Sequence, residues 1–265
     1  MTYQSLFDEL DKGLMGNNDY FRGRKDDLCY LAIFKELLSE LQSAVSVRTP
    51  DSDFENLEKR VFHPPRVIRK LLDHKLGTKR DTSYLAEGGR LFCDALQIGL
   101  RTYRGEDTSA LIAKLERGIG EMDEDLLFEN VYQPPDKTTF TSSAPNYSVQ
   151  TARNIQGTTT QQDLLFIALA HGGVAAGMDV FLRYCALADS RDSEFYVVRF
   201  SRCKKLDHEP RLNEREREML REKAERKEII VFDEDSWTGG TINIAAGYFG
   251  NLFQRRVMCF TNLHP

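Results

Sequence analysis

From residue 164 onward, short apolar runs alternate with helical patterns, and this alternation limits the fold of the chain more than any other feature. The apolar runs cover residues 164–169, 195–200, 229–232 and 257–261, and the helical patterns between them cover 174–188, 213–227 and 242–253. Strands that alternate with helices predict a parallel sheet with right-handed crossovers, an α/β fold. Because ligands of such sheets bind at the carboxyl ends of the strands, the candidate functional residues are those that directly follow a strand.

The N-terminal half predicts helices instead. Between residues 26 and 45, leucine and alanine recur every three or four positions, the spacing of one face of an amphipathic helix. Similar patterns cover residues 54–76, 82–103 and 109–118. After residue 132, proline, serine, threonine and glycine replace the helical pattern. We therefore expect an all-α N-terminal domain over residues 1–135, a linker or extended segment over 136–160, and the α/β domain over 161–265.

The charge balance argues against nucleic acid and anionic membranes as partners. Lys and Arg total 36 against 41 Asp and Glu, a net charge of −5, so no global positive field attracts these polyanions. The apolar runs are far shorter than the roughly 20 residues that cross a bilayer. The N-terminus carries acidic residues and lacks the basic and apolar regions of a secretory signal. We therefore expect a cytoplasmic protein.

The cysteines and histidines do not predict a metal site. The five cysteines are widely spaced and form no CxxC pair, which favours reduced structural thiols. None of the five histidines lies at a metal-ligand spacing from a cysteine or another histidine. A structural zinc site is therefore not expected.

The segment with the most chemical information follows the apolar run at 229–232. Three consecutive carboxylates end this strand: Asp233, Glu234 and Asp235. A short loop then closes with Thr-Gly-Gly-Thr at the start of a helix. Backbone N–H groups at a helix N-terminus attract phosphate, while carboxylates suit sugar hydroxyls and a divalent cation. Together these residues predict a site for a sugar that carries a phosphate.

The same segment resembles the phosphoribosyl diphosphate binding motif of the type I phosphoribosyltransferases. In that family an acidic pair contacts the ribose hydroxyls, and the loop wraps the 5-phosphate. The resemblance implies that Asp233 and Glu234 are the catalytic pair and hold Mg²⁺. It implies a binding loop made of Asp235, Ser236, Trp237, Thr238, Gly239, Gly240 and Thr241. An ordinary strand–turn–helix connection would explain the loop but not the acidic residues.

A second segment resembles the diphosphate loop of the family, in which a basic residue precedes paired glycines. The strand at 164–169 leads into Ala170, His171, Gly172 and Gly173. Paired glycines let backbone donors approach an anion, and the following helix adds its positive end. Taken alone, the segment could equally be a tight strand-to-helix turn. Its position before the acidic motif favours diphosphate binding, as does the fold that the resemblance implies, a parallel sheet flanked by helices.

A basic stretch after the strand at 195–200 occupies the position of the family's mobile loop. Lys204 and Lys205 would contact the diphosphate there, and the alternative is a solvated basic turn. The chain departs from the family at three points. Trp237 stands where some members place a carboxylate that handles a base proton, and His171 replaces Arg or Lys. The third departure is that Pro265 directly follows the last predicted strand. We therefore expect base recognition to come from the N-terminal half or from another chain.

Two functions stay open at this point. The first is a transferase of the pentosyltransferase class, which binds Mg²⁺ and phosphoribosyl diphosphate and passes the phosphoribosyl group to a nitrogenous base or another nucleophile. The second is a non-catalytic sensor that binds a nucleotide in the same pocket. In the sensor, residues 1–135 would dock a protein partner, whereas in the enzyme they would form a hood over the site. A homodimer is compatible with either function.

Overall fold

The computed structural model describes residues 31–33, 97–98, 101, 106–121, 130–132, 142, 145–170, 172–200 and 207–263. The chain forms two compact units, Met1–Pro135 and Asp136–Pro265, and each is described by itself.

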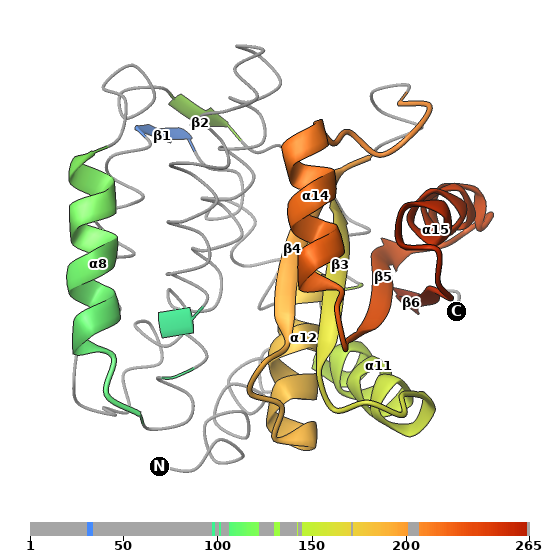
Figure 1. Ribbon diagram of the computed structural model, residues 1–265, viewed down its shortest axis with the longest axis horizontal. Coiled ribbons are helices and arrows are strands. Elements are labelled where there is room, and N and C mark those ends of the chain that lie inside the picture. The colour runs from blue at the N-terminus through green and yellow to red at the C-terminus, as the bar shows by residue number, and fades with distance from the viewer. Residues whose placement is uncertain are drawn as a thin grey trace. The chain divides into compact units, whose positions relative to one another are not determined.

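The C-terminal unit contains a sheet of four parallel strands, which confirms the expected α/β class. The strands are β3 (Leu164–Ala170), β4 (Glu194–Arg199), β5 (Glu228–Asp235) and β6 (Met258–Leu263). Their order in the sheet is β4-β3-β5-β6, and each neighbouring pair is parallel (Figure 1). The predicted strands agree with these bounds to within a few residues.

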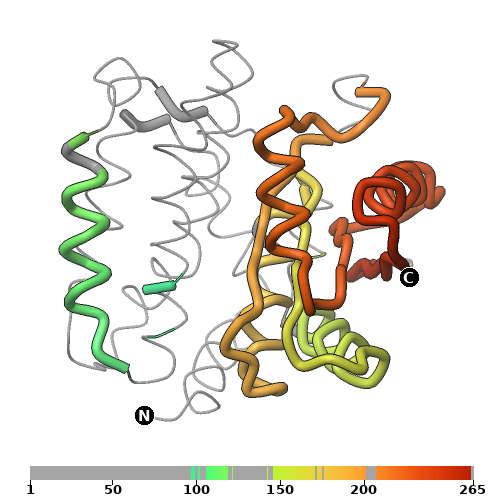
Figure 2. The backbone as a smooth tube through the Cα atoms, viewed as in Figure 1, coloured from blue at the N-terminus to red at the C-terminus, as the bar shows by residue number. Residues whose placement is uncertain are grey.

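Helices connect the strands and cover the sheet. They are α11 (Pro145–Thr158), α12 (Gly173–Ala188), α14 (Glu214–Lys223) and α15 (Gly240–Phe253). After β3, helix α12 leads outward to β4, and α14 returns the chain past β3 to β5 (Figure 2). The direction of winding therefore reverses between β3 and β5. In sheets of this kind, such a reversal leaves a crevice at the carboxyl ends of the two strands.

Side-chain contacts show which helices cover which face. On one face, Phe166 and Phe195 contact Phe181 of α12, with ring centroids 5.8 and 5.4 Å away. On the other face, the Tyr196 hydroxyl donates to Glu216 of α14 at 2.8 Å. Helix α11 packs on α12 and β6, and α15 packs on β5, β6 and α14. Fully buried strand residues between these layers form the core.

Residues 145–158 form a helix, where the sequence predicts a linker or extended segment. Helix α11 begins at Pro145, a position where the missing N–H of proline costs nothing. Ala152 and Ile155, three residues apart, are fully buried. The polar side chain of Thr151 is also buried, and it donates to Asn262 of β6 at 2.8 Å. The prediction fails because buried polar residues hide the helical period in the sequence.

In the N-terminal unit, the described residues include both helix and strand. Helix α8 (Ser109–Gly120) confirms the helical pattern predicted at 109–118. Strands β1 (Leu31–Ile33) and β2 (Asn130–Tyr132) pair antiparallel, so the predicted helix over 26–45 is wrong at these three residues of β1. A short apolar run fits the helical period and the strand period equally well. The pairing with β2 shows that residues 31–33 form a strand. The pattern at 54–76 and most of that at 82–103 lie outside the described residues. Within the described part of the chain, no helix has the length and apolar character needed to cross a membrane.

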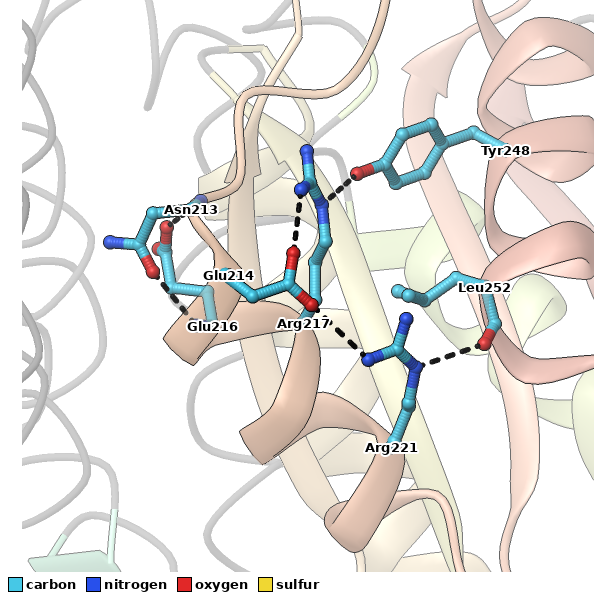
Figure 3. A network of polar contacts seen from close by, with 7 residues as sticks. All are labelled: Asn213, Glu214, Glu216, Arg217, Arg221, Tyr248 and Leu252. Atoms are coloured by element: carbon cyan, nitrogen blue, oxygen red, sulfur yellow. Dashed lines mark hydrogen bonds and ion pairs between the residues drawn. The ribbon is translucent and has the colours of Figure 1, made fainter.

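Polar contacts join α14 to α15, as Figure 3 shows. Asn213 and Glu216 form a capping box that starts α14. Arg217 donates to Glu214 at 2.9 Å and to the Tyr248 hydroxyl of α15 at 3.0 Å. Arg221 reaches the Leu252 carbonyl at 3.4 Å. These contacts hold α15 against its neighbour, and the N-terminus of α15 is part of the candidate site.

A candidate phosphosugar site at the carboxyl ends of β3 and β5

The fold brings together two predicted motifs, the glycine turn after β3 and the carboxylates at the end of β5. Strands β3 and β5 are hydrogen-bonded neighbours, with Ala168 in register with Phe232. The turn after β3 therefore lies against the end of β5. A Cβ on Gly173 would lie 3.2 Å from the Phe232 carbonyl oxygen and 3.3 Å from the Asp233 Cα. The first turn of α12 and the acidic end of β5 form one continuous surface.

The two acidic side chains leave the strand on opposite sides, but their carboxylates come close to each other at its end. Phe232 contacts Phe166 with ring centroids 5.5 Å apart, on the side covered by α12. Because strand side chains alternate, the Cβ of Asp233 starts on the α15 side and that of Glu234 on the α12 side. The Asp233 side chain nevertheless brings its Oδ1 to within 3.5 Å of the position that a Cβ on Gly173 would take. The Glu234 carboxylate accordingly occupies the space beside the Gly172 backbone. Both carboxylates therefore lie beside the start of α12.

The loop between β5 and α15 has the features of an anion site. The Ser236 N–H donates to the Leu263 carbonyl of β6 at 3.3 Å, and the Gly239 N–H donates to the Ser236 carbonyl at 3.2 Å. Gly239 has a φ of 67°, a left-handed conformation that favours glycine. It precedes α15, whose first-turn N–H groups have no partners within the helix. Trp237 lies in this loop, and 79% of its surface is exposed.

Burial and mutual repulsion perturb the carboxylates. Loss of solvent, followed by the nearby charge of Glu234, raises the pKa of Asp233 well above the ordinary value of an aspartate. The Glu234 backbone N–H donates to Asp233 Oδ1 at 3.0 Å and opposes this shift. A carboxyl group placed in this way gains from a hydroxyl donor or a cation beside it. Ribose hydroxyls and a magnesium ion would each supply such a partner.

The described residues contain no group of three or more His, Cys, Asp or Glu side chains able to hold a metal ion. The carboxylates of Asp233 and Glu234 lie close enough to repel each other, and two carboxylates alone are fewer ligands than an all-protein metal cage needs. Magnesium keeps much of its water and binds through one or two carboxylates together with substrate phosphates. Asp233 and Glu234 are therefore the residues that could contact a magnesium ion carried by a phosphate ligand.

Three predicted site residues, His171, Lys204 and Lys205, lie outside the described residues. The others line one edge of the sheet. Ala170 is buried at the end of β3, where its carbonyl accepts the Phe200 N–H at 3.3 Å. The partly exposed surface between that point and the start of α15 includes Gly172, Asp233, Glu234, Asp235, Ser236, Trp237, Thr238, Gly240 and Thr241.

Arg199, at the carboxyl end of β4, is a site residue that our sequence reasoning missed. It is in register with Ala170 and lies on the α12 side, as Phe195 does. Only 3% of its side chain is exposed, and its Nε lies 3.4 Å from Asp207 Oδ2. Arg211 shares the same aspartate at 3.1 Å. Within the described residues, nothing accepts a hydrogen bond from Arg199 Nη1, so this buried guanidinium keeps a donor for an anion that reaches the end of β4.

Comparisons of the chain with protein-family models, curated proteins and solved structures found no match. The function is therefore inferred from the residues of the site.

Proposed function

We propose that this protein binds magnesium-bound phosphoribosyl diphosphate and transfers its phosphoribosyl group to a nitrogen nucleophile, with release of diphosphate. The type of α/β fold that we propose with this function is that of the type I phosphoribosyltransferases. The resemblance of residues 228–241 to the family motif suggested both.

One observation carries the proposal: three kinds of group follow one another along the carboxyl edge of the sheet. The glycine loop before α15 offers backbone donors near β6, and the carboxylates of Asp233 and Glu234 end β5. The start of α12 follows β3, and Arg199 ends β4. Along this edge, a site for an anion is followed by a site for sugar hydroxyls and then by a second site for an anion. A ribose with a phosphate at one end and a diphosphate at the other has matching groups in the same order.

The chemistry follows from this placement. A nucleophilic nitrogen displaces the diphosphate at the anomeric carbon, whose bond to oxygen breaks as positive charge develops on the sugar. Asp233 and Glu234 would orient the ribose and stabilise that charge, while Arg199 and the amides of α12 would stabilise the leaving diphosphate. Magnesium on the diphosphate would supply further charge neutralisation.

The test is a diphosphate-release assay over the common nucleobases, with phosphoribosyl diphosphate and magnesium. Asp233→Asn combined with Glu234→Gln should abolish release without unfolding the protein. The matched control, Glu218→Gln with Glu222→Gln on the exposed side of α14, should release diphosphate at the wild-type rate. Retained turnover in the double Asp233/Glu234 variant would refute the site. Binding without release from any base would instead assign the protein as a nucleotide sensor.

A further inference from the structure

Thr261 of β6 carries a buried hydroxyl beside the candidate site. Its residue is 6% exposed, and within the described part of the chain its Oγ1 has no hydrogen-bond partner. Thr261 is the register partner of Asp233 across the β5–β6 pair. Buried polar groups are nearly always satisfied, so an orphaned hydroxyl next to a functional carboxylate requires a physical reason.

The neighbouring residue fixes the side of the sheet on which this hydroxyl lies. Asn262 points toward α11, because its side chain donates to the Ser142 carbonyl and to Ser148 Oγ and accepts from Thr151. Side chains alternate along a strand, so Thr261 lies on the opposite side, which α15 covers. The Cα–Cβ bond of Asp233, its register partner, starts on that same side. The hydroxyl therefore lies on the face that α15 covers, two residues before the last register pair of β5 and β6, Asp235 and Leu263.

The loop above this position is anchored to the same strand. The Leu263 carbonyl, two residues after Thr261, accepts the Ser236 N–H at 3.3 Å. Helix α15 starts at Gly240, shortly after the strand that carries Asp233. Thr261 and the loop that leads into α15 thus belong to the same end of the β5–β6 pair, on the face that α15 covers.

We propose that the Thr261 hydroxyl is a ligand-binding group that donates a hydrogen bond to a phosphate oxygen of a phosphorylated pentose held at the N-terminus of α15. The inference rests on the proposed function and adds a residue outside the loop motif. The hydroxyl lacks a partner among the described residues because its partner is the ligand. Removing it should therefore weaken binding without weakening the fold.

The experiment titrates ribose 5-phosphate into the full-length protein. The indole fluorescence of Trp237, the sole tryptophan, and calorimetry both follow the binding. Thr261→Val removes the hydroxyl at nearly constant shape and should weaken binding about tenfold or more, as expected for a hydrogen bond to a charged group. Thr261→Ser keeps the hydroxyl and should bind within about threefold of the wild type.

Stability separates this role from a structural one. Exchanging an unsatisfied buried hydroxyl for a methyl group should leave the unfolding midpoint of Thr261→Val unchanged or raise it. Thr151→Val is the matched control, because its equally buried hydroxyl is bonded to Asn262 on the far side of the sheet. It should lower the midpoint and leave binding intact.

Two results would overturn the inference, and they differ in what else they affect. Wild-type affinity in Thr261→Val, with a wild-type protein that does bind ribose 5-phosphate, would refute the role of Thr261 alone. A lowered midpoint in Thr261→Val equal to that of Thr151→Val would do the same. Failure of the wild type to bind ribose 5-phosphate would refute this inference and the proposed function together.

Discussion

The carboxylate of Glu234 occupies the space that a side chain at residue 172 would need. A Cβ built on Gly172 would overlap both the carboxylate carbon and its oxygens. The backbone of Gly172 has φ −60° and ψ −49°, a conformation open to any residue. The glycine therefore makes room for the Glu234 carboxylate, and backbone geometry does not call for it.

Gly172→Ala should displace the Glu234 carboxylate and weaken binding of phosphoribosyl diphosphate. The end of a glutamate side chain moves easily, so we expect a loss of stability of less than about 1 kcal/mol. The double variant with Glu234→Gln should bind no worse than the weaker single variant, because both changes remove the same contact. Calorimetric titration of the three variants measures this coupling.

Gly157→Ala is the control for that experiment. Gly157 lies in α11, and a Cβ at this position would meet nothing within 4 Å, so alanine should stabilise the helix by about 0.5–1 kcal/mol and leave binding unchanged. Additive losses in the Gly172/Glu234 double variant would show that the two residues act independently.

Asp233→Asn should stabilise the ligand-free, metal-free protein, and more so as the pH rises. The folded state raises the pKa of Asp233, mainly by burial and then by the charge of Glu234. A raised pKa means that the folded state holds the proton more tightly, so stability is full in acid below the ordinary carboxyl pKa of about 4. It falls as the pH rises from there through the folded-state pKa.

Urea unfolding of wild type and Asp233→Asn between acid and neutral pH measures this effect. The two proteins should be almost equally stable in acid and should diverge toward neutral pH, with the asparagine variant the more stable. A constant difference between them at every pH would contradict the assigned burial of the charge.

Gly177→Ala should destabilise the C-terminal unit by about 1–3 kcal/mol, because it overfills the layer between α12 and the sheet. A Cβ at Gly177 would lie 2.9 Å from Phe232 Cδ1 and 3.2 Å from the Ala168 Cβ. Gly247→Ala in α15, where a Cβ meets nothing within 4 Å, should instead be stabilising. Thermal unfolding distinguishes the two, and equal midpoints would count against the packing of α12.

Tyr196→Phe should cost about 1.5–3 kcal/mol, because the lost hydroxyl leaves Glu216 buried with one fewer donor. Glu216 is 1% exposed and also caps α14. The control is Tyr248→Phe, which removes a hydroxyl bonded to the partly exposed Arg217 and should cost under about 1 kcal/mol. Chemical denaturation compares the two, and an equal cost would show that burial of Glu216 adds nothing.

The sequence was sufficient for the parallel sheet, because buried strands show as apolar runs and glycine turns mark their ends. It also located the acidic end of β5 beside the glycine turn after β3, since both follow a strand of one sheet. Helix α11 escaped prediction because buried polar residues such as Thr151 are bonded to groups distant in the chain. The pairing of β1 with β2 was not predicted either, because the two strands are also distant in the chain.

Arg199 and Thr261, the two residues that we add to the proposed site, belong to strands and not to motifs. Their relevance depends on the strand order and on which side of the sheet each faces, and neither follows from composition or spacing. The sequence carried a signal only for Arg199, which is an arginine at the end of a buried strand. The roles of His171, Lys204 and Lys205 stay predictions, because these residues lie outside the described part of the chain.

The most direct test of the phosphosugar site is calorimetric titration of the purified protein with phosphoribosyl diphosphate and magnesium, repeated with Asp233→Asn/Glu234→Gln. We predict saturable binding by the wild type and a loss of that binding in the variant, with the fold intact by circular dichroism. Absence of binding by the wild type, or equal binding by both proteins, would contradict a phosphosugar site at the ends of β3 and β5.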